Sequence, residues 1–334
     1  MCPKKSYCGQ EKIFYNFEKA DDYSINVSRS RMHTHLSRND LDYIDQIIYE
    51  GVVSNGQSLH HIYVGSKLLQ SMCSERTIRR IIYRGELKTK AHMLRRYVVY
   101  KHEYIKPKEI YCKKDVRAYV NRTYSDYIDY IEHNKSKNIM QFDSVIGKIN
   151  DKKSILTKTF KKYGFQFGIL IEKGDPRSVD NAIRNIKKKI GDELFYKIFA
   201  INIADNGSEF TTFYNIEYDC DGLIKCKSFF TRPYNSSDKA ECESDRRLVR
   251  YFCPKGKSLN DITQEQIDKM YSNINSYVRE SQNNQCPYDL IKNKFGKKFL
   301  DLINIKRIPN KKVKLKPIIQ PKKKHKKDSI IMSK

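Results

Sequence analysis

The chain contains no tryptophan and no apolar run of about 18 residues, the length that a membrane-spanning helix needs. Its first ten residues, MCPKKSYCGQ, have no apolar segment of the kind found in secretory signals. The nine cysteines show no paired spacing, which favours a reducing compartment over a disulfide-stabilised secreted fold. We therefore expect a cytoplasmic protein with no membrane partner.

Acidic residues are scarce relative to basic ones. The 334 residues include 65 Lys and Arg against 39 Asp and Glu, so the formal net charge is +26. Such an excess favours a polyanionic partner, and nucleic acid is the first candidate. With 39% hydrophobic and 12% aromatic residues the chain can bury a core, and its length suits two or three domains.

Residues 40–105 have the pattern of a helix-turn-helix DNA-binding region. The stretches LDYIDQIIYEGV and GQSLHHIYVGSKLL predict a helix and a short second helix. CSERTIRRIIYRGEL then predicts an amphipathic helix that begins after Ser74 and ends at Gly85. In this motif the last helix enters the DNA major groove, whereas the alternative is an ordinary basic amphipathic helix. Its polar surface carries four arginines: Arg76, Arg79, Arg80 and Arg84.

Residues 138–300 alternate between strand and helix patterns. NIMQFDSVIG, KSILTKTFKKYG and FQFGILIEKG predict three strands of an antiparallel meander. A helix capped by Asp175, a strand ending in FAINIA and the strand KSFFTRPY follow, before helices over 237–252 and from Thr263 onward. This order predicts an α/β fold, a ribonuclease-H-like mixed sheet with helices on its faces, preceded by the all-α region.

Three carboxylates occupy positions that such a sheet would bring together. Asp143 lies in the first strand, Asp205 ends the fourth, and Glu243 lies in SSDKAECESDRRLVRYFCPKG. Converging carboxylates need positive charge between them, and Mg²⁺ or Mn²⁺, as a pair of ions, would supply it and activate water or a DNA 3′-hydroxyl. The alternatives are an ordinary Asp-containing turn at Asp205 and an exposed helical Glu243.

Several segments together resemble DDE-type bacterial insertion-sequence transposases of the group named after insertion sequence 30. The similar segments are GQSLHHI with CSERTIRRIIYRGEL, RTYSDYIDYI, FDSVIGK, ADNGSEF, KAECESDRRLVRYFCPKG and INSYVRESQNNQCPYDLI. The resemblance covers residues 40–296. It implies a transposase that binds terminal inverted repeats of double-stranded DNA and catalyses metal-dependent strand cleavage and strand transfer. It also implies a homo-oligomer on DNA, in the bacterial cytoplasm and associated with the nucleoid.

By the same resemblance Asp143, Asp205 and Glu243 form the catalytic, metal-binding triad. Glu241 is the alternative third carboxylate, but counting back from the Pro-Lys-Gly sequence at 254–256 favours Glu243. Lys239 precedes Glu243 by one helical turn and would contact a DNA phosphate, unless it is an ordinary solvated lysine.

The remaining segments define the expected domain boundaries. We interpret residues 1–39 as a remnant linker whose preceding helix-turn-helix is missing, 106–137 as a connector, and 301–334 as a flexible basic tail. The missing helices leave two alternatives to an active transposase. One is a truncated, non-catalytic DNA-binding remnant, and the other is a ribonuclease-H-like nuclease.

Overall fold

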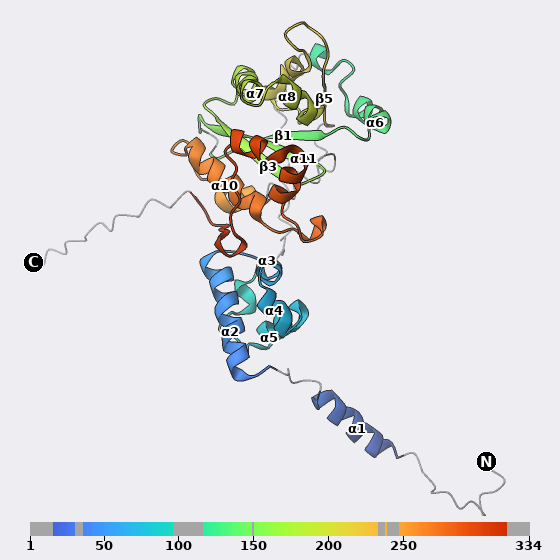
Figure 1. Ribbon diagram of the computed structural model, residues 1–334, viewed down its shortest axis with the longest axis vertical. Coiled ribbons are helices and arrows are strands. Elements are labelled where there is room, and N and C mark those ends of the chain that lie inside the picture. The colour runs from blue at the N-terminus through green and yellow to red at the C-terminus, as the bar shows by residue number, and fades with distance from the viewer. Residues whose placement is uncertain are drawn as a thin grey trace, which may run out of the picture.

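The computed structural model describes residues 16–30, 36–95, 116–148, 150–232, 238 and 247–318. Helix α1 (Phe17–Ser30) is followed by a small helical domain, and the α/β core lies beyond it, as Figure 1 shows. Within these ranges, no helix combines the length and apolar character needed to cross a membrane.

The helical domain comprises α2 (Arg38–Tyr49), a π-helical turn (Glu50–Ser54), α3 (Leu59–Val64), α4 (Lys67–Met72) and α5 (Glu75–Arg84). GQSLHHIYVGSKLL was expected to be one short helix, but it forms two. The break occurs because Ser66 caps a new helix, its hydroxyl accepting the Leu69 N–H. Nine buried apolar residues from these elements, together with Leu87 and Leu94 after α5, form a separate hydrophobic cluster.

The core is built on five strands: β1 (Ile139–Ile146), β2 (Ser154–Phe160), β3 (Phe165–Ile171), β4 (Ile201–Ala204) and β5 (Lys227–Phe230). Their order is β3-β2-β1-β4-β5. β1, β2 and β3 are antiparallel neighbours, whereas β4 pairs in parallel with both β1 and β5. This is the strand order of a ribonuclease-H-like sheet, so the predicted fold class is confirmed.

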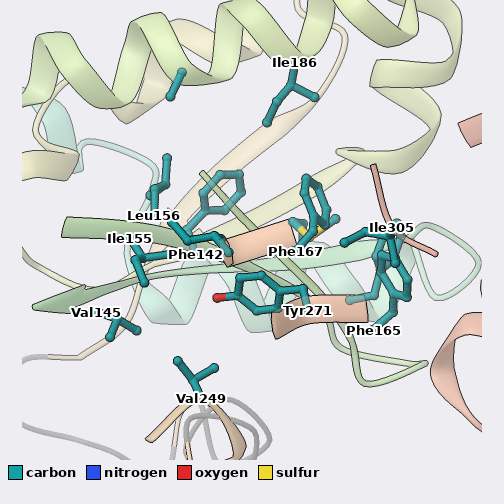
Figure 2. Close-up of a cluster of buried hydrophobic side chains, with 14 of the residues drawn as sticks. Phe142, Val145, Ile155, Leu156, Phe165, Phe167, Ile186, Val249, Tyr271 and Ile305 are labelled. Carbon is teal, nitrogen blue, oxygen red and sulfur yellow. The ribbon is translucent and has the colours of Figure 1, made fainter. Parts of the chain in front are cut away.

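Helices cover both faces of this sheet. α7 (Pro176–Ile190) and α8 (Asp192–Ile198) pack on one face, and α6 (Tyr124–His133) and α10 (Gln264–Ser276) on the other. α11 (Pro287–Leu302) contacts β3, α7 and α10. Figure 2 shows Phe142 and Ile186 on the first side, with Val145, Tyr271 and Val249 on the second. The single helix expected after Asp175 is broken at Gly191, whose φ of 83° favours glycine.

The expectation of a flexible tail over 301–334 is wrong for residues 301–318. Ile305, Val313 and Leu315 are buried, because these apolar side chains alternate with lysines and give the segment an inner side. The segment also reaches the helical domain, where its short helical turn Asn310–Lys312 contacts α3 (Figure 1). The lysine run at 322–327 lies outside the described residues.

A buried histidine fastens the helical domain to the core. His61 is 1% exposed and stacks on Tyr277 with 4.6 Å between ring centroids. Val278 donates its N–H to His61 Nδ1 over 3.1 Å, and His61 Nε2 lies 3.1 Å from the Asn310 carbonyl oxygen. Burial lowers the pKa of His61 to about 4. The imidazole is therefore neutral near neutral pH, with Nδ1 accepting and Nε2–H donating.

Polar groups of the helical domain complete this contact with residues 305–318. Gln57 donates from Nε2 to the carbonyl oxygens of Asn310 (2.9 Å) and Val313 (2.8 Å). The Leu315 N–H donates to the Asn55 carbonyl over 3.0 Å. Because hydrogen bonds are directional, these bonds together favour one alignment of the helical domain with residues 305–318. The two domains are therefore held in one relative orientation.

A lysine is buried inside the apolar core of the sheet. Lys158, in β2, is 0% exposed; its Nζ lies 3.4 Å from the Leu156 carbonyl oxygen and 5.3 Å from the Phe167 ring centroid. Burial lowers its pKa to about 7. The unfolded chain keeps this proton at higher pH than the folded chain, so stability falls as pH decreases from 10 toward 7.

We predict that Lys158→Met raises the free energy of unfolding at pH 7, because it removes a buried ammonium without changing the side-chain length much. Between pH 7 and 9 the native chain should gain about 2 kcal/mol relative to the variant. Denaturant unfolding at both pH values measures this difference. For Lys188→Met, an exposed change on α7, the free energy of unfolding should vary with pH as it does in the native chain. A parallel profile for Lys158→Met would contradict the prediction.

Candidate active site and nucleic-acid interface

Two predicted carboxylates occupy neighbouring strands of the sheet. Asp143 lies within β1 and is 4% exposed, and Asp205 directly follows β4 and is partly buried. β1 and β4 pair in parallel with Gln141 opposite Ile203, so continuing the register by two residues sets Asp143 level with Asp205. Residues i and i+2 share a face, and adjacent strands lie about 4.8 Å apart. The register thus places both carboxylates on one face at one level.

The turn after β4 holds Asp205 in place. Its Oδ1 accepts the Gly207 N–H over 3.1 Å, which is an Asp-containing turn of the ordinary kind. Asn206 donates from Nδ2 to the Thr231 carbonyl oxygen at 2.5 Å, and the Thr231 N–H donates to the Ala204 carbonyl at 3.0 Å. The local turn and a metal-binding role are therefore compatible, because the turn orients the carboxylate at the strand end.

The predicted third carboxylate, Glu243, lies outside the described residues, as do its alternative Glu241 and the predicted DNA contact Lys239. The helical residues 247–252 that follow them are described. Val249 lies beside Val145 on one side of the sheet in Figure 2, and Arg250 donates from Nη1 to the Ile146 carbonyl oxygen over 3.2 Å. This helix therefore packs at the end of β1, on the face that carries Asp143.

The donor set suits a hard divalent cation. Asp143 and Asp205 provide carboxylate oxygens at one level of adjacent strands, and Mg²⁺ and Mn²⁺ prefer oxygen ligands from few protein groups. Among the residues with described positions there is no group of three or more His, Cys, Asp or Glu side chains arranged to hold a metal. A complete site would need a further ligand from the segment that contains Glu243.

Tyr119 lies close enough to Asp205 for the carboxylate to affect its pKa, although no sequence pattern marked it. Its ring contacts Phe230 with 4.6 Å between centroids, at the end of the strand next to β4. Burial raises the pKa of the Tyr119 phenol, and the negative charge of Asp205 raises it further. Residues 106–137 were interpreted as a connector from the sequence. A single tyrosine in such a segment belongs to no motif that would mark it as a site residue. Its position became evident from the packing of the connector against β5.

A buried ion pair fixes this connector. Arg122 donates from Nε and Nη2 to the Glu217 carboxylate over 3.1 and 2.8 Å, and the Glu217 side chain is 0% exposed. Glu217 also accepts the Ser228 N–H of β5 at 2.7 Å, and the Arg122 carbonyl accepts the Phe230 N–H at 2.9 Å. The pair therefore joins the segment that carries Tyr119 to the sheet edge near Asp205.

The arginine helix α5 begins and ends where the sequence predicts. Ser74 caps it by accepting the Thr77 N–H, and Gly85 ends it in the left-handed conformation with φ of 78°. Ile78, Ile81 and Ile82 are buried. The predicted DNA-contacting residues are all exposed: Arg76, Arg79, Arg80 and Arg84.

These arginines differ in their surroundings. Arg79 donates from Nη2 to Glu75 over 2.7 Å, and the other oxygen of Glu75 lies 2.8 Å from His60 Nδ1. Arg84 lies 3.8 Å from the Glu86 carboxylate. Tyr83 on the same helix is 58% exposed. Exposed arginines beside an exposed aromatic ring form a surface suited to a DNA groove.

Comparisons with known proteins show similarity to transposases. No protein-family model matches the chain. Over 77 residues it is 31% identical to the transposase for insertion sequence element IS4351 of Bacteroides fragilis, covering 23% of this chain and 22% of that protein. Over 207 residues it is 25% identical to the probable transposase for insertion-like sequence element IS1161 of Streptococcus salivarius, covering 62% and 55%. The matches thus span about half or less of these relatives' length.

Two solved structures are also similar. The catalytic core domain of BIV integrase has a TM-score of 0.34 and 18% identity, and the match covers 48% of this chain and 97% of that one. The HTLV-2 integrase catalytic core domain in complex with magnesium has a TM-score of 0.30 and 13% identity, covering 46% and 95%. Both scores are low, so the fold assignment depends on the strand order of the sheet. In sequence, the chain is similar to transposases of insertion sequences.

We predict that Arg122→Ala lowers the free energy of unfolding by about 3 kcal/mol, because it leaves the buried Glu217 carboxylate uncompensated. Urea unfolding followed by circular dichroism measures the change. Arg184→Ala is the matched control, since Arg184 forms an exposed ion pair with Asp180 and its loss should cost less than about 1 kcal/mol. Equal losses for the two variants would contradict the buried role of Arg122.

Proposed function

We propose that the protein is a DDE-type transposase of the insertion sequence 30 group. It binds the terminal inverted repeats of its element through the helical domain. The core then catalyses metal-dependent cleavage of the DNA and transfer of the 3′-hydroxyl end to target DNA. The observation that supports the proposal is the parallel β1–β4 register, which pairs Gln141 with Ile203 and, continued by two residues, leads to Asp143 and Asp205.

The carboxylates have a defined chemical task in this reaction. Asp143 and Asp205, with Glu243 as the third ligand, would hold one or two Mg²⁺ or Mn²⁺ ions, which supply the positive charge for in-line phosphoryl displacement. Asp143 is held within the pairing of β1, and Asp205 is oriented by the Gly207 N–H. Ligands on rigid strand ends keep a metal site in a fixed geometry.

DNA binding is supported by the charge and by α5. The net charge of +26 favours a polyanion, and the exposed arginines of α5 lie opposite its buried isoleucines. In the proposed complex α5 occupies the major groove, with Arg76 and Arg80 at base edges or phosphates. Lys239 would contact a phosphate near the catalytic carboxylates. Self-association on paired DNA ends and action at the bacterial nucleoid belong to the same proposal.

Two alternatives use the same structure differently. A non-catalytic remnant would bind the repeats without cutting them, whereas a ribonuclease-H-like nuclease would cut without regard to the repeats. The helical domain fastened to the core counts against a simple nuclease, because it presents α5 on the same rigid body.

We predict that Asp205→Asn abolishes Mn²⁺-dependent nicking of a labelled duplex that carries the terminal repeats, and that Asp143→Asn does the same. The loss should be at least about 100-fold, because each change removes a charged metal ligand. Asp221→Asn, at an exposed loop residue, should leave the rate unchanged. EDTA should stop the native reaction. Nicking that persists in both strand variants would overturn the assignment.

We predict that Arg76→Ala with Arg80→Ala weakens binding to the repeats by at least about tenfold, since each groove contact contributes about 1–3 kcal/mol. Arg79 is retained because its guanidinium is already bonded to Glu75. A gel-shift titration at fixed salt measures the affinity. The control pair is Arg177→Ala with Arg184→Ala on α7, which removes the same charge from the core. Equal affinity losses for both pairs would contradict a specific role for α5.

A further inference from the structure

A cleft of about 800 Å³ separates the helical domain from the core. Glu75 and Arg79 at the start of α5 line one wall, and Lys161, Arg247 and Arg279 of the core line the other. Because His61, Gln57 and Asn55 fasten the two domains beside it, the two walls have a fixed spacing. The width of the cleft is therefore set by contacts within the chain.

The cleft carries an excess of positive charge. Its lining includes five cationic side chains and two carboxylates, Glu75 and Glu280. Glu75 already neutralises Arg79, to which it is bonded over 2.7 Å. The core wall contributes Lys161, Arg247 and Arg279 to the lining, and two guanidinium nitrogens of Arg279 are buried. A polyanion complements this surface, whereas the lysine-rich residues 322–327 carry the same sign of charge and do not.

The cleft adjoins both proposed DNA sites. Arg79 is in its wall, and Arg76 and Arg80 lie on the adjoining surface of α5. On the core side the Lys161 N–H donates to the Ile139 carbonyl at the start of β1. Asp143 follows four residues later, about 13 Å along the strand. That distance corresponds to about four base pairs of duplex.

We propose that this cleft binds the phosphate backbone of the same DNA duplex that α5 recognises, with Lys161 and Arg247 as phosphate contacts. One chain then contacts the duplex on both sides of the domain junction. These contacts direct the phosphate backbone of the DNA toward the end of β1 that carries Asp143. This inference rests on the proposed DNA recognition by α5, and it adds a second contact surface that sequence motifs did not mark.

The rigid attachment gives the cleft its function. If the domains moved independently, binding at α5 would not restrict where the core meets the DNA. With His61 and Tyr277 stacked and the hydrogen bonds of Gln57 formed, the core cations stay at a set distance from α5. The spacing between the recognised sequence and the cut would therefore be set within one chain.

The test compares the full-length native chain with the variant Lys161→Gln/Arg247→Gln by fluorescence anisotropy on a repeat duplex across a salt series. Losing two phosphate contacts should reduce the slope of log affinity against log salt by about 1.8. Lys188→Gln/Arg184→Gln on α7 is the matched control and should leave the slope unchanged. Circular dichroism confirms that each variant is folded.

A second arm uses a shortened duplex that covers the α5 site and omits the flank facing the core. The cleft variant should bind this short duplex as the native chain does, and lose affinity on the extended one. An unchanged slope, a loss shared by the control pair, or an equal loss on both duplexes would overturn the proposal.

The outcome also separates this inference from the proposed function. If the native chain nicks the repeats and the cleft variant binds DNA normally, the cleft proposal is wrong and the proposed function stands. Native chain that fails to nick in Mn²⁺ but shows the cleft-dependent slope would support the cleft and favour a non-catalytic DNA-binding protein. Absence of any repeat binding would overturn both.

Discussion

Parallel pairing of β1 with β4 is the constraint on which the candidate active site depends. The register sets Gln141 opposite Ile203, and its continuation by two residues leads to Asp143 and Asp205, which lie far apart in the sequence. A one-residue shift would turn Asp143 into the opposite, apolar layer around Phe142. The antiparallel pairing with β2 and the helices on both faces maintain that register. The relative position of these two carboxylates is thus a consequence of sheet alignment.

The junction between the domains is a second constraint, and it consists of several ordinary polar groups. A neutral histidine, a glutamine and several backbone groups exchange hydrogen bonds that are buried or partly buried. Because hydrogen bonds are directional, these groups together favour one alignment of the two domains. The junction joins two folded units, so that α5 and the carboxylates have a set separation.

Local patterns predicted much of this structure. The caps Ser74, Asp175 and Thr263 begin helices as expected, and the strands of the meander lie where alternation and turns indicated. Failures came where tertiary contacts outweighed local composition. Residues 301–318 read as a basic tail, yet three apolar side chains bury into the core. Lys158 lies in an apolar layer because its strand position, not its polarity, decides its direction.

The sequence by itself determined the periodicities, the caps and the chemical types: an arginine-rich helix and carboxylates at strand positions. Those follow from interactions within a few residues. The tertiary structure decided which distant residues meet. It brought Tyr119 within electrostatic reach of Asp205, the turn Asn310–Lys312 onto α3, and Lys161 and Arg247 into one cleft with the start of α5. Such meetings depend on burial and register across the whole chain, and no local pattern encodes them.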